Sequence, residues 1–577
     1  MKTEIIHRDY PQDIAAKLAI TPPVMSRIYA ARGITSAEEV DLSLKNLLPF
    51  SELGDINKAA AIVIAAIEKS ATITVIGDYD VDGATSAALA IRALKLFGAY
   101  NVDYIIPNRF NHGYGLSVPL IEELYPQSEN DLIITVDNGI TSYDGINLAK
   151  SRGFKVIVTD HHLPGERLPA ADAIVNPNCN SSQFASKNLC GAGVAFYMMS
   201  AVRAQMRDDG YFRKKGIQTP NMAKFLDLVA LATVADVVPL DRNNRILTSY
   251  GLNLIRKGEC VAGISAILKV AGREASTIGS SDIGFVIGPR LNAAGRLDDM
   301  SLGVEILLED NPYRAEDMAY KLDGFNSRRK NIESDMKKKA LEELKTAYSK
   351  LIENPCSFCL YDENWHQGVI GILASRIKDS YNRPVAVFTE SGDDKDSISG
   401  SVRSVDGLHI RNVLDKINKS SPNLISRYGG HSMAAGLSIK KTDLERFKNL
   451  FESHVGGIIA NRDMTKKIIT DGQLSAEEFS LDIAQSIRDG EPWGQHFPEP
   501  IFHGVFEIEE KTSINDKHTR FALRPKKCNF SVEAIIFNHN IDEFAGASEV
   551  VAVFQLTVNH YRGFTKLQLI IQHWEKG

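Results

Sequence analysis

Short apolar runs alternate with longer helix-like runs between residues 72 and 160. The helix-like runs cover residues 84–97 and 142–152, and Gly98 and Gly153 follow them as glycines commonly follow helices. Strands that alternate with helices in this way predict βαβ units and a parallel sheet. The strand-like runs, rich in Val and Ile, are residues 72–76, 102–106, 132–136 and 155–158.

A different pattern starts near residue 315, where apolar residues recur three, four or seven positions apart and no proline occurs before Pro355. This spacing predicts one long amphipathic helix, or two helices broken at Gly324. Residues 355–460 again mix strand-like and helix-like runs. After about residue 465 short β-rich runs predominate, which favours a small barrel.

Together these patterns predict an α/β protein with five parts. The chain of 577 residues is long enough for several buried cores. The parts are an N-terminal helical segment (1–54), a parallel-sheet domain (55–314), a helical connector (315–354), a second α/β domain (355–464) and an OB-like β-barrel (465–577).

The composition narrows the class of protein. With 44% hydrophobic and 24% charged residues the chain is typical of globular proteins, and six cysteines are too few for a disulfide scaffold. The first residues lack the apolar stretch of a signal peptide, and no uncharged apolar run approaches the roughly 18 residues of a membrane helix. We therefore expect a cytoplasmic protein without membrane association. The net charge of −6 says little about partners.

Acidic residues and histidines directly follow three of the predicted strands. Residues 78–83 read Asp-Tyr-Asp-Val-Asp-Gly, residues 137–139 read Asp-Asn-Gly and residues 160–162 read Asp-His-His. Because the carboxyl ends of parallel strands meet at one edge of a sheet, these side chains should converge. Taken alone, the first motif could be a turn or a calcium-type loop, and the second a plain turn. Taken together they predict a metal site.

Converging carboxylates repel one another unless cations lie between them. Oxygen ligands with one imidazole suit Mn²⁺ or Mg²⁺ better than a thiolate-preferring metal. Two such ions can activate a water and stabilise a leaving oxygen in phosphoryl transfer. Asp236 lies in an apolar stretch, residues 232–239, where an unpartnered carboxylate is costly, so we interpret it as a further ligand.

Four segments of the chain resemble the motifs of the DHH phosphoesterase superfamily: residues 77–83, 136–139, 160–162 and 235–239. Residues 365–371, 399–404 and 429–436 resemble the DHHA1-type second domain that accompanies it. The order of these motifs, followed by a β-rich tail, is similar to that of the single-strand-specific 5′→3′ exonucleases of this superfamily. The resemblance covers essentially the whole chain.

The resemblance implies a role for each residue of the acidic motifs. Asp137 would bridge two divalent ions, Asp160 would orient His161, and His162 would face the scissile phosphate. Asp82 would be an outer acid or would shape the turn before Gly83. The residues implied to bind the two metal ions are Asp78, Asp80, Asp137, His161 and Asp236.

The resemblance also suggests residues that contact the substrate. Of these, Arg109, Arg290 and Arg403 are our choices for phosphate binding, although any single arginine could equally be solvated or paired structurally. Tyr114 and Trp365 could stack on bases or simply pack. The candidates with polar or aromatic side chains in Gly-containing segments are Arg109, His112, Tyr114, Arg290, Asn292, Arg296, Ser401, Arg403 and His431.

Two further features have simpler interpretations. Cys356 and Cys359 have CxxC spacing but no second pair, which favours a structural strand. The basic cluster between Arg520 and Lys527 could contact DNA or be a solvated face of the barrel.

The leading functional hypothesis is therefore a metal-dependent exonuclease of DNA recombination and repair that releases 5′-mononucleotides from single-stranded DNA. Polarity and DNA preference come only from the resemblance, as do the expected partners, single-stranded-DNA-binding protein and a RecQ-type helicase. We expect a monomer. Two alternatives are a phosphodiesterase of the same superfamily that acts on small substrates, and a non-catalytic DNA-binding scaffold. The connector and tail disfavour the first alternative, and the complete set of metal ligands disfavours the second.

Overall fold

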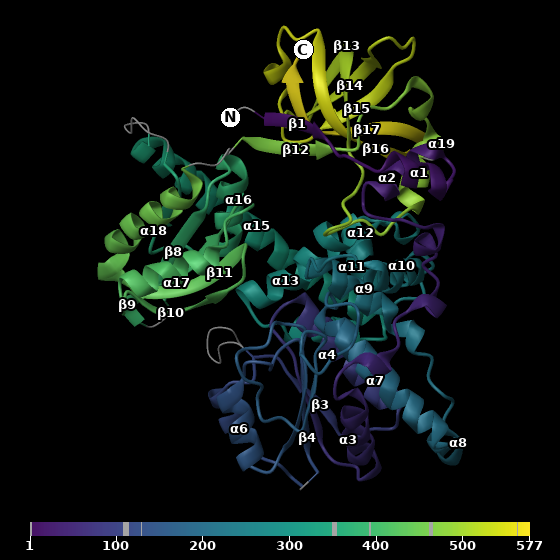
Figure 1. Ribbon diagram of the computed structural model, residues 1–577, viewed down its shortest axis with the longest axis vertical. Coiled ribbons are helices and arrows are strands. Elements are labelled where there is room, and N and C mark those ends of the chain that lie inside the picture. Colours follow the sequence, from purple (N-terminus) through teal and green to yellow (C-terminus); the bar gives the residue numbers. More distant parts are fainter. Residues whose placement is uncertain are drawn as a thin grey trace. The chain divides into compact units, whose positions relative to one another are not determined.

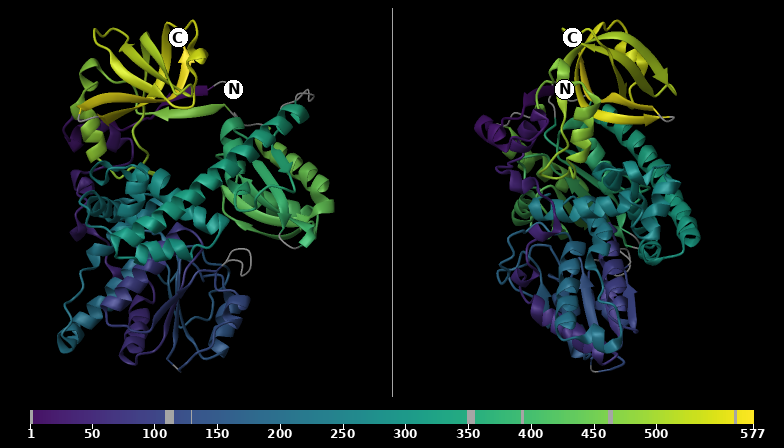
Figure 2. Two further views of the ribbon diagram at one scale, coloured as in Figure 1. Left: turned by 180° about the vertical axis from the view of Figure 1, so that it is seen from behind. Right: turned by 90° about the vertical axis from the view of Figure 1, so that its right-hand side faces the viewer.

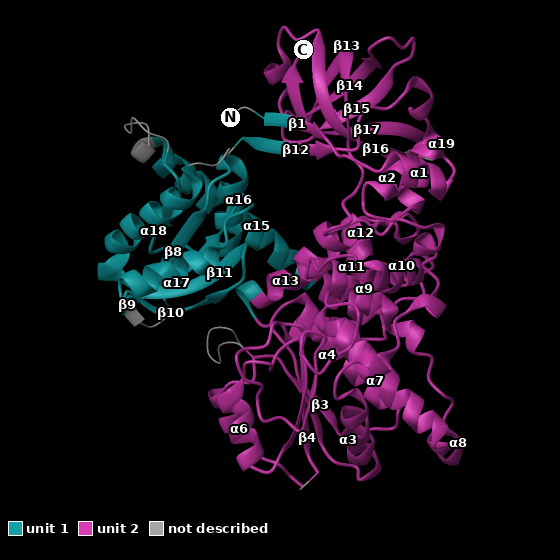
Figure 3. Ribbon diagram, in the orientation of Figure 1, with its two compact units in different colours: residues 1–4, 296–298, 321–467 teal, residues 5–295, 299–320, 468–577 magenta. Residues whose placement is uncertain are grey.

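The computed structural model describes residues 3–107, 115–128, 130–348, 355–391, 394–460, 465–561 and 564–577. The chain divides into two compact units (Figure 3). The smaller unit comprises residues 1–4, 296–298 and 321–467, and the larger unit comprises residues 5–295, 299–320 and 468–577. The five predicted domain boundaries stay a prediction.

The larger unit contains a five-stranded parallel sheet in the order β3-β2-β4-β5-β6. Leu132 lies opposite Ile73 on one side and Lys155 on the other, so the strands are in register at their amino ends. The predicted parallel sheet is confirmed, and β6 is a strand that the sequence pattern did not show. The strands are β2 (Ile73–Ile76), β3 (Val102–Ile105), β4 (Leu132–Val136), β5 (Lys155–Thr159) and β6 (Ala173–Val175).

Helices cover both faces of this sheet, with α6 on one side and α3 on the other (Figures 1 and 2). Every residue of β4 is buried, as expected of a central strand between two helical layers. The helices of the larger unit are α1 (Gln12–Leu18), α2 (Pro23–Ala30), α3 (Ile56–Glu68), α4 (Val81–Leu96), α5 (Val118–Glu122), α6 (Tyr143–Ser151), α7 (Gly191–Asp208), α8 (Tyr211–Lys215), α9 (Leu226–Ala235), α10 (Arg242–Arg256), α11 (Ala262–Val270), α12 (Ser280–Asp282), α14 (Ser301–Leu308) and α19 (Leu481–Asp489).

The N-terminal segment is only partly helical. Its first described residues form strand β1 (Thr3–His7), which pairs with β12 (Lys466–Thr470) in a two-stranded sheet. The prediction of helices alone was wrong here, because β1 finds its partner in residues more than 450 positions away, which no local pattern reveals.

Five strands of the larger unit close into a barrel in the order β13-β14-β15-β17-β16, which confirms the predicted β-barrel. Only β15 and β17 pair in parallel. Alternate residues of β14 and β15 are buried, and Phe502, Phe506 and Phe554 of β13 and β16 are fully buried with them. The strands are β13 (Phe502–Ile514), β14 (His518–Pro525), β15 (Val532–Ile536), β16 (Glu549–Tyr561) and β17 (Phe564–Lys576).

Half of the basic cluster on the barrel is neutralised by the barrel's own acids. Arg524 pairs with Glu507 and Glu509, and Lys526 pairs with Glu549. These pairs favour the interpretation of the cluster as a solvated face, because a paired cation offers less to a phosphate.

The smaller unit contains a mixed five-stranded sheet in the order β10-β11-β9-β8-β7, in which only β7 and β8 are parallel. Helix α15 (Pro312–Tyr348) begins in the larger unit and continues through Gly324 without a break. Of the two predicted alternatives for the connector, the structure thus shows the single long helix. The other elements are β7 (Phe358–Tyr361), β8 (Val385–Ser391), β9 (Asp394–Arg403), β10 (Ile425–Gly430), β11 (Ala434–Lys440), α16 (Ile370–Tyr381), α17 (Ile410–Ser420) and α18 (Leu444–Ile459).

Two ambiguous residues of the smaller unit are structural. Trp365 is 5% exposed and packs in the core with Leu360 and Ile370, so it offers no face to a base. Cys359 lies in β7, and burial raises the pKa of its thiol to about 12, so the thiol stays protonated. In the described part of the chain, no helix combines the length and the apolar character needed to cross a membrane.

A buried carboxyl group makes the stability of the larger unit dependent on pH. Burial raises the pKa of Glu499 from 4.5 to about 7, although a hydrogen bond with Gln555 opposes the shift. The resulting stabilisation is complete below pH 4.5 and is lost as the pH rises through 7, because the folded state must then bury a charge.

We therefore expect Glu499→Gln to raise the free energy of unfolding at pH 8 by about 1–3 kcal/mol and to change it little at pH 4. Denaturant titrations at the two pH values measure this difference, with the exposed Glu477→Gln as a control that should show none. Equal effects of Glu499→Gln at both pH values would contradict the assignment of a buried titrating carboxyl.

Candidate metal centre

The carboxyl ends of β2, β4 and β5 bring the acidic motifs together, as predicted. Three groups of residues lie close enough to hold a metal ion, with one ligand atom from each residue within 4.8 Å of the others. The groups are Asp78, Asp80 and Asp137; Asp82, His161 and Asp236; and Asp137, His161 and His162.

The turn from β2 into α4 positions the first acids. Asp80 is the N-cap of α4, and its Oδ1 accepts a hydrogen bond from the amide of Gly83 at 3.2 Å. A side chain at Gly83 would overlap the backbone of Asp78, so the turn requires glycine there. The motif therefore folds Asp78 and Asp80 toward the same space.

Asp137 occupies a strained position after β4. Its φ of 63° lies in the left-handed region, which a non-glycine residue adopts at a cost. The side-chain Nδ2 of its neighbour Asn138 donates hydrogen bonds to the carbonyls of Ile76 and Val136, which ties this loop to β2. On its other side, Gly191 at the start of α7 packs so closely that a Cβ would lie 2.5 Å from the Cβ of Asp137.

His161 lies at the centre of the cluster. Its Nε2 is 3.1 Å from Oδ1 of Asp137, 3.6 Å from Oδ2 of Asp236 and 3.8 Å from Oδ2 of Asp82. Asp236 is the C-cap of α9, so a helix end brings this fourth acid to the sheet edge, as the sequence predicts.

Asp160 lies beside both histidines of its motif. Its Oδ1 bonds Nδ1 of His162 at 2.7 Å and thus orients His162, while the expected orientation of His161 by Asp160 stays a prediction. The reason is local: the same carboxylate accepts hydrogen bonds from the backbone amides of both histidines and of Ile140, which turns it toward the second ring. The prediction that His162 faces a phosphate stays a prediction, since His162 also belongs to a group that could hold a metal.

Asp82 contacts the start of α7, and its predicted role as an outer acid or as a residue that shapes the turn stays a prediction, since it also belongs to a group that could hold a metal. Its carboxylate accepts hydrogen bonds from the amides of Gly191 and Ala192 at 2.6 and 2.8 Å, at the N-terminus of α7. The turn before Gly83 is held by Asp80. Asp82 therefore fixes α7 behind the cluster.

Electrostatics show that the cluster needs positive charge. Burial, and then the nearby charge of Asp80, raise the pKa of Asp82 to about 6. Burial and the other carboxylates raise the pKa values of Asp137 and Asp236 well above the usual range. Several buried carboxylates beside one imidazole are the donor set that Mn²⁺ and Mg²⁺ accept, so the residues fit a pair of divalent ions.

Two candidates for substrate contact lie on one helix of the larger unit, and the first of them adjoins the metal centre. Oδ1 of Asn292 in α13 (Gly288–Leu297) accepts a hydrogen bond from the amide of Val81 at 3.3 Å, next to Asp80. Arg290 on the same helix donates to the carbonyl of Val286 at 2.8 Å. Arg109, His112 and Tyr114 lie outside the described residues.

The remaining candidates belong to the smaller unit. Arg296 donates to the carbonyl of Gly368 at 3.1 Å, and His431 lies between β10 and β11. Arg403 at the end of β9 is largely buried and donates from Nη1 to Oγ of Ser401 at 3.0 Å. Burial lowers the pKa of this guanidinium, and no carboxylate of the described residues is paired with it.

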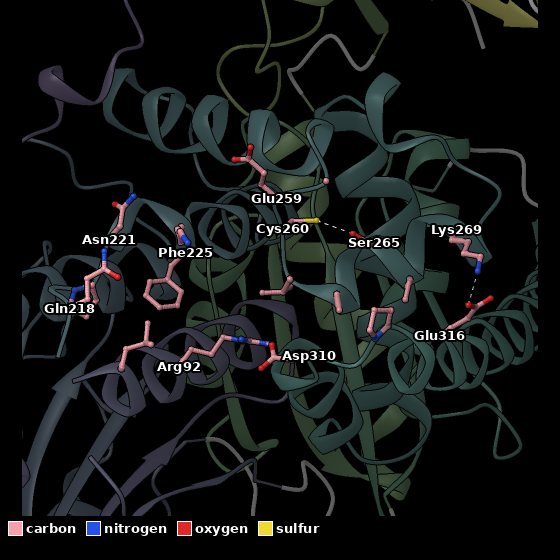
Figure 4. Close-up of a pocket in the computed structure, with 18 of the residues that line it drawn as sticks. Arg92, Gln218, Asn221, Phe225, Glu259, Cys260, Ser265, Lys269, Asp310 and Glu316 are labelled. Atoms are coloured by element: carbon pink, nitrogen blue, oxygen red, sulfur yellow. Dashed lines mark hydrogen bonds and ion pairs between the residues drawn. The ribbon is translucent and has the colours of Figure 1, made fainter. Parts of the chain in front are cut away.

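A cavity of about 1040 Å³ lies elsewhere in the larger unit and has none of the candidate residues in its lining (Figure 4). Two of its cations are paired with acids of the lining: Arg92 binds Asp310 at 2.8 Å, and Lys269 binds Glu316 at 2.7 Å. The cavity also lacks the converging carboxylates and histidines that lie at the sheet edge. We therefore place the functional site at the carboxyl edge of the sheet.

Comparisons with known families agree with this placement. Residues 72–233 match the N-terminal domain of the DHH family, residues 344–457 match the DHHA1 domain, and residues 470–573 match the RecJ OB domain. The single-stranded-DNA-specific exonuclease RecJ of Escherichia coli is 45% identical over 99% of both chains. The chain belongs to the RecJ family. The resemblance to the DHH superfamily, and the fold class expected from it, are confirmed.

Other members of the RecJ family are also similar to this chain in sequence or in structure. RecJ of Haemophilus influenzae is 45% identical over 96% of both chains. Among solved structures, RecJ from Thermus thermophilus in complex with Mn²⁺ matches with a TM-score of 0.79 at 27% identity, over 100% of this chain and 80% of that one. A complex of the same protein with Mg²⁺ matches with a TM-score of 0.75 at 26% identity, over 100% and 78%.

Sequence reasoning missed Gly191 and Asn138 as parts of the site. Asn138 was visible only as a member of a turn motif, and its bond to Ile76 depends on the pairing of β2 with β4. Gly191 was signalled by the Gly-Ala-Gly that opens α7, since closely spaced glycines at a helix start often mark a tight approach. The residue that Gly191 contacts, Asp137, could not be predicted from the neighbouring sequence.

Proposed function

We propose that this protein is an exonuclease specific for single-stranded DNA that hydrolyses phosphodiester bonds at the carboxyl edge of its parallel sheet. The observation that carries this proposal is the convergence of buried carboxylates on His161, in a chain whose relatives bear that activity in their names. The finer assignments, 5′→3′ polarity and release of 5′-mononucleotides, are proposed because the chain belongs to the RecJ family.

The metal ligands of the proposed enzyme are Asp78, Asp80, Asp137, His161 and Asp236, with Asp137 shared by two groups in the cluster and therefore suited to bridge. Two Mn²⁺ or Mg²⁺ ions bound there would supply activation of a water and stabilisation of the leaving oxygen. The chain itself holds its carboxylates in place through the turn at Gly83 and the close approach of Gly191 at the start of α7.

His162 would act on the substrate from the edge of the cluster. Burial opposes its charge, but the hydrogen bond and the charge of Asp160 outweigh burial and raise the pKa of His162 to about 9. Asp160 also fixes the orientation of the ring, because its Oδ1 lies 2.7 Å from Nδ1. A ring held in this way can present Nε2 to a phosphate oxygen of the substrate.

Arg403 would bind the terminal phosphate of the strand. A largely buried guanidinium that is not paired with a described carboxylate is suited to an anion, and Ser401 adds a hydroxyl beside it. Gly371 keeps the space open, because a Cβ there would lie 2.9 Å from Nη2 of Arg403. Arg290, Asn292, Arg296 and His431 complete the proposed contacts with DNA.

The cellular setting is proposed from the family as well. A monomer in the cytoplasm would process single strands during DNA recombination and repair, with single-stranded-DNA-binding protein and a RecQ-type helicase as partners. Digestion of 5′- and 3′-labelled DNA, single- and double-stranded, with Mn²⁺, Mg²⁺ or EDTA tests the proposal. Cleavage of duplex as fast as single strand, or activity in EDTA, would overturn it.

We expect Arg403→Ala to raise KM for a 5′-phosphorylated strand by about 10- to 100-fold, as a lost charge-assisted hydrogen bond implies. A 5′-hydroxyl strand should be affected much less. The exposed Arg411 in the same unit provides a matched control, Arg411→Ala, with no such preference. If Arg403→Ala slows both strands equally, Arg403 does not read the terminal phosphate.

A further inference from the structure

Phe285 is an aromatic side chain that the fold leaves in solvent. It is 83% exposed, whereas its neighbours Ile283, Val286 and Ile287 are buried. These residues form the π-helix η6 (Ile283–Ile287), which lies between α12 and α13. A π-helical turn is rare and frequently marks a functional site, and here it directs one large apolar side chain outward while its neighbours stay in the core.

The π-helix borders the metal centre. Its Gly284 packs against Val234, and Gly288 packs against Ala235, with would-be Cβ atoms 3.6 and 3.5 Å from those side chains. Val234 and Ala235 form the last turn of α9, which ends at Asp236. Phe285 is therefore carried by a segment that contacts the helix end presenting a proposed metal ligand.

A second exposed apolar side chain flanks the same turn. Val237 follows Asp236, is 61% exposed and has a φ of 58°, which is a strained conformation for a β-branched residue. Its amide donates to the carbonyl of Val234, the residue on which Gly284 packs. Strain of this kind is retained where it serves a site. Val234 therefore contacts both Gly284, which precedes Phe285, and Val237.

A cation belongs to the same segment. Arg290 donates from Nη1 to the carbonyl of Val286, which places its guanidinium next to the residue that follows Phe285. The segment thus carries an aromatic side chain and a guanidinium, two groups that suit the two parts of a nucleotide, its base and its phosphate.

We propose that Phe285 is the platform on which one nucleobase of the substrate strand stacks next to the metal centre. The proposal rests on the proposed function, because it assigns the base-positioning residue of that same site. Bases in a duplex are already stacked and paired, so the platform also favours an unpaired strand.

Binding and cleavage of short 5′-phosphorylated oligonucleotides test the platform in the full chain. Fluorescence anisotropy with Ca²⁺ measures binding, and single-turnover assays with Mn²⁺ measure cleavage. Each strand is used intact and with one abasic site moved along its first few positions. The variants are Phe285→Ala, the conservative Phe285→Trp, and Tyr100→Ala as a control that removes an equally exposed aromatic residue.

We expect Phe285→Ala to weaken binding of the intact strand by roughly 10- to 100-fold, with Phe285→Trp restoring it and Tyr100→Ala having no effect. At one abasic position the wild-type protein should bind the strand more weakly by the same factor. Phe285→Ala should not weaken the binding of that strand any further. If Phe285→Ala weakens binding by the same factor at every abasic position, Phe285 has only a structural role, and the platform is wrong.

The two proposals fail in different ways. If the wild-type protein binds the strands with the expected abasic pattern but does not cleave them, the proposed exonuclease is wrong and the platform stands. If it cleaves normally and Phe285→Ala changes neither binding nor its abasic pattern, the platform is wrong and the exonuclease stands. If it neither binds nor cleaves, both are wrong.

Discussion

Replacing Asp137 with alanine should lower the single-turnover rate of hydrolysis by at least about a thousandfold, because loss of a bridging ligand removes several kcal/mol of transition-state stabilisation. Asp137 belongs to two of the three groups that could hold a metal and lies 3.1 Å from Nε2 of His161. Affinity for single strands should change by no more than about threefold, since phosphate contacts elsewhere supply most of it.

The control for this variant is Asp144→Ala, which removes an exposed acid on α6, just beyond the same loop. It should retain wild-type rates at every Mn²⁺ concentration. Titration of Mn²⁺ by calorimetry provides a second readout, in which Asp137→Ala should lose binding sites that Asp144→Ala keeps. An Asp137→Ala enzyme with more than about a tenth of the wild-type rate would contradict a two-metal site built on this residue.

The acids of this site could be predicted from the sequence because each follows a different strand of the same parallel sheet. Once β2, β4 and β5 were placed in one sheet, the meeting of Asp78, Asp137 and His161 followed from topology alone. Asp236 was found by a different rule, the cost of a carboxylate in an apolar segment, and its place at the end of α9 agrees with it.

The orientation of individual side chains could not be predicted in this way. Whether Asp160 turns to one histidine or the other depends on which backbone amides it accepts, and those amides belong to a turn after β5 and to Ile140. Asp82 binds the start of α7, more than a hundred residues further along the chain. Such contacts are set by tertiary packing, which a motif does not encode.

Close packing of glycine against the metal centre is a second feature that could not be predicted from the sequence, because glycine has no functional group. Gly191 has no functional group, yet a methyl group there would lie 2.5 Å from Cβ and 2.9 Å from Cα of Asp137. Real Cβ atoms do not approach so closely, so either α7 or Asp137 must move. Asp137 already has a strained backbone, and α7 is fixed by Asp82, so the displacement falls on the site.

We expect Gly191→Ala to reduce hydrolysis by about 100-fold, the effect typical of a 1 Å displacement of a catalytic group. The matched control is Gly193→Ala in the same helical turn, where the nearest atom, Cδ2 of Leu189 at 3.2 Å, can give way. Because alanine is favoured in helices, Gly193→Ala should keep its activity within about threefold and gain slightly in stability. Both variants should retain the wild-type circular dichroism spectrum, so that unfolding is excluded. If Gly191→Ala is as active as Gly193→Ala, Asp137 tolerates displacement, and its strained position is not part of the catalytic geometry.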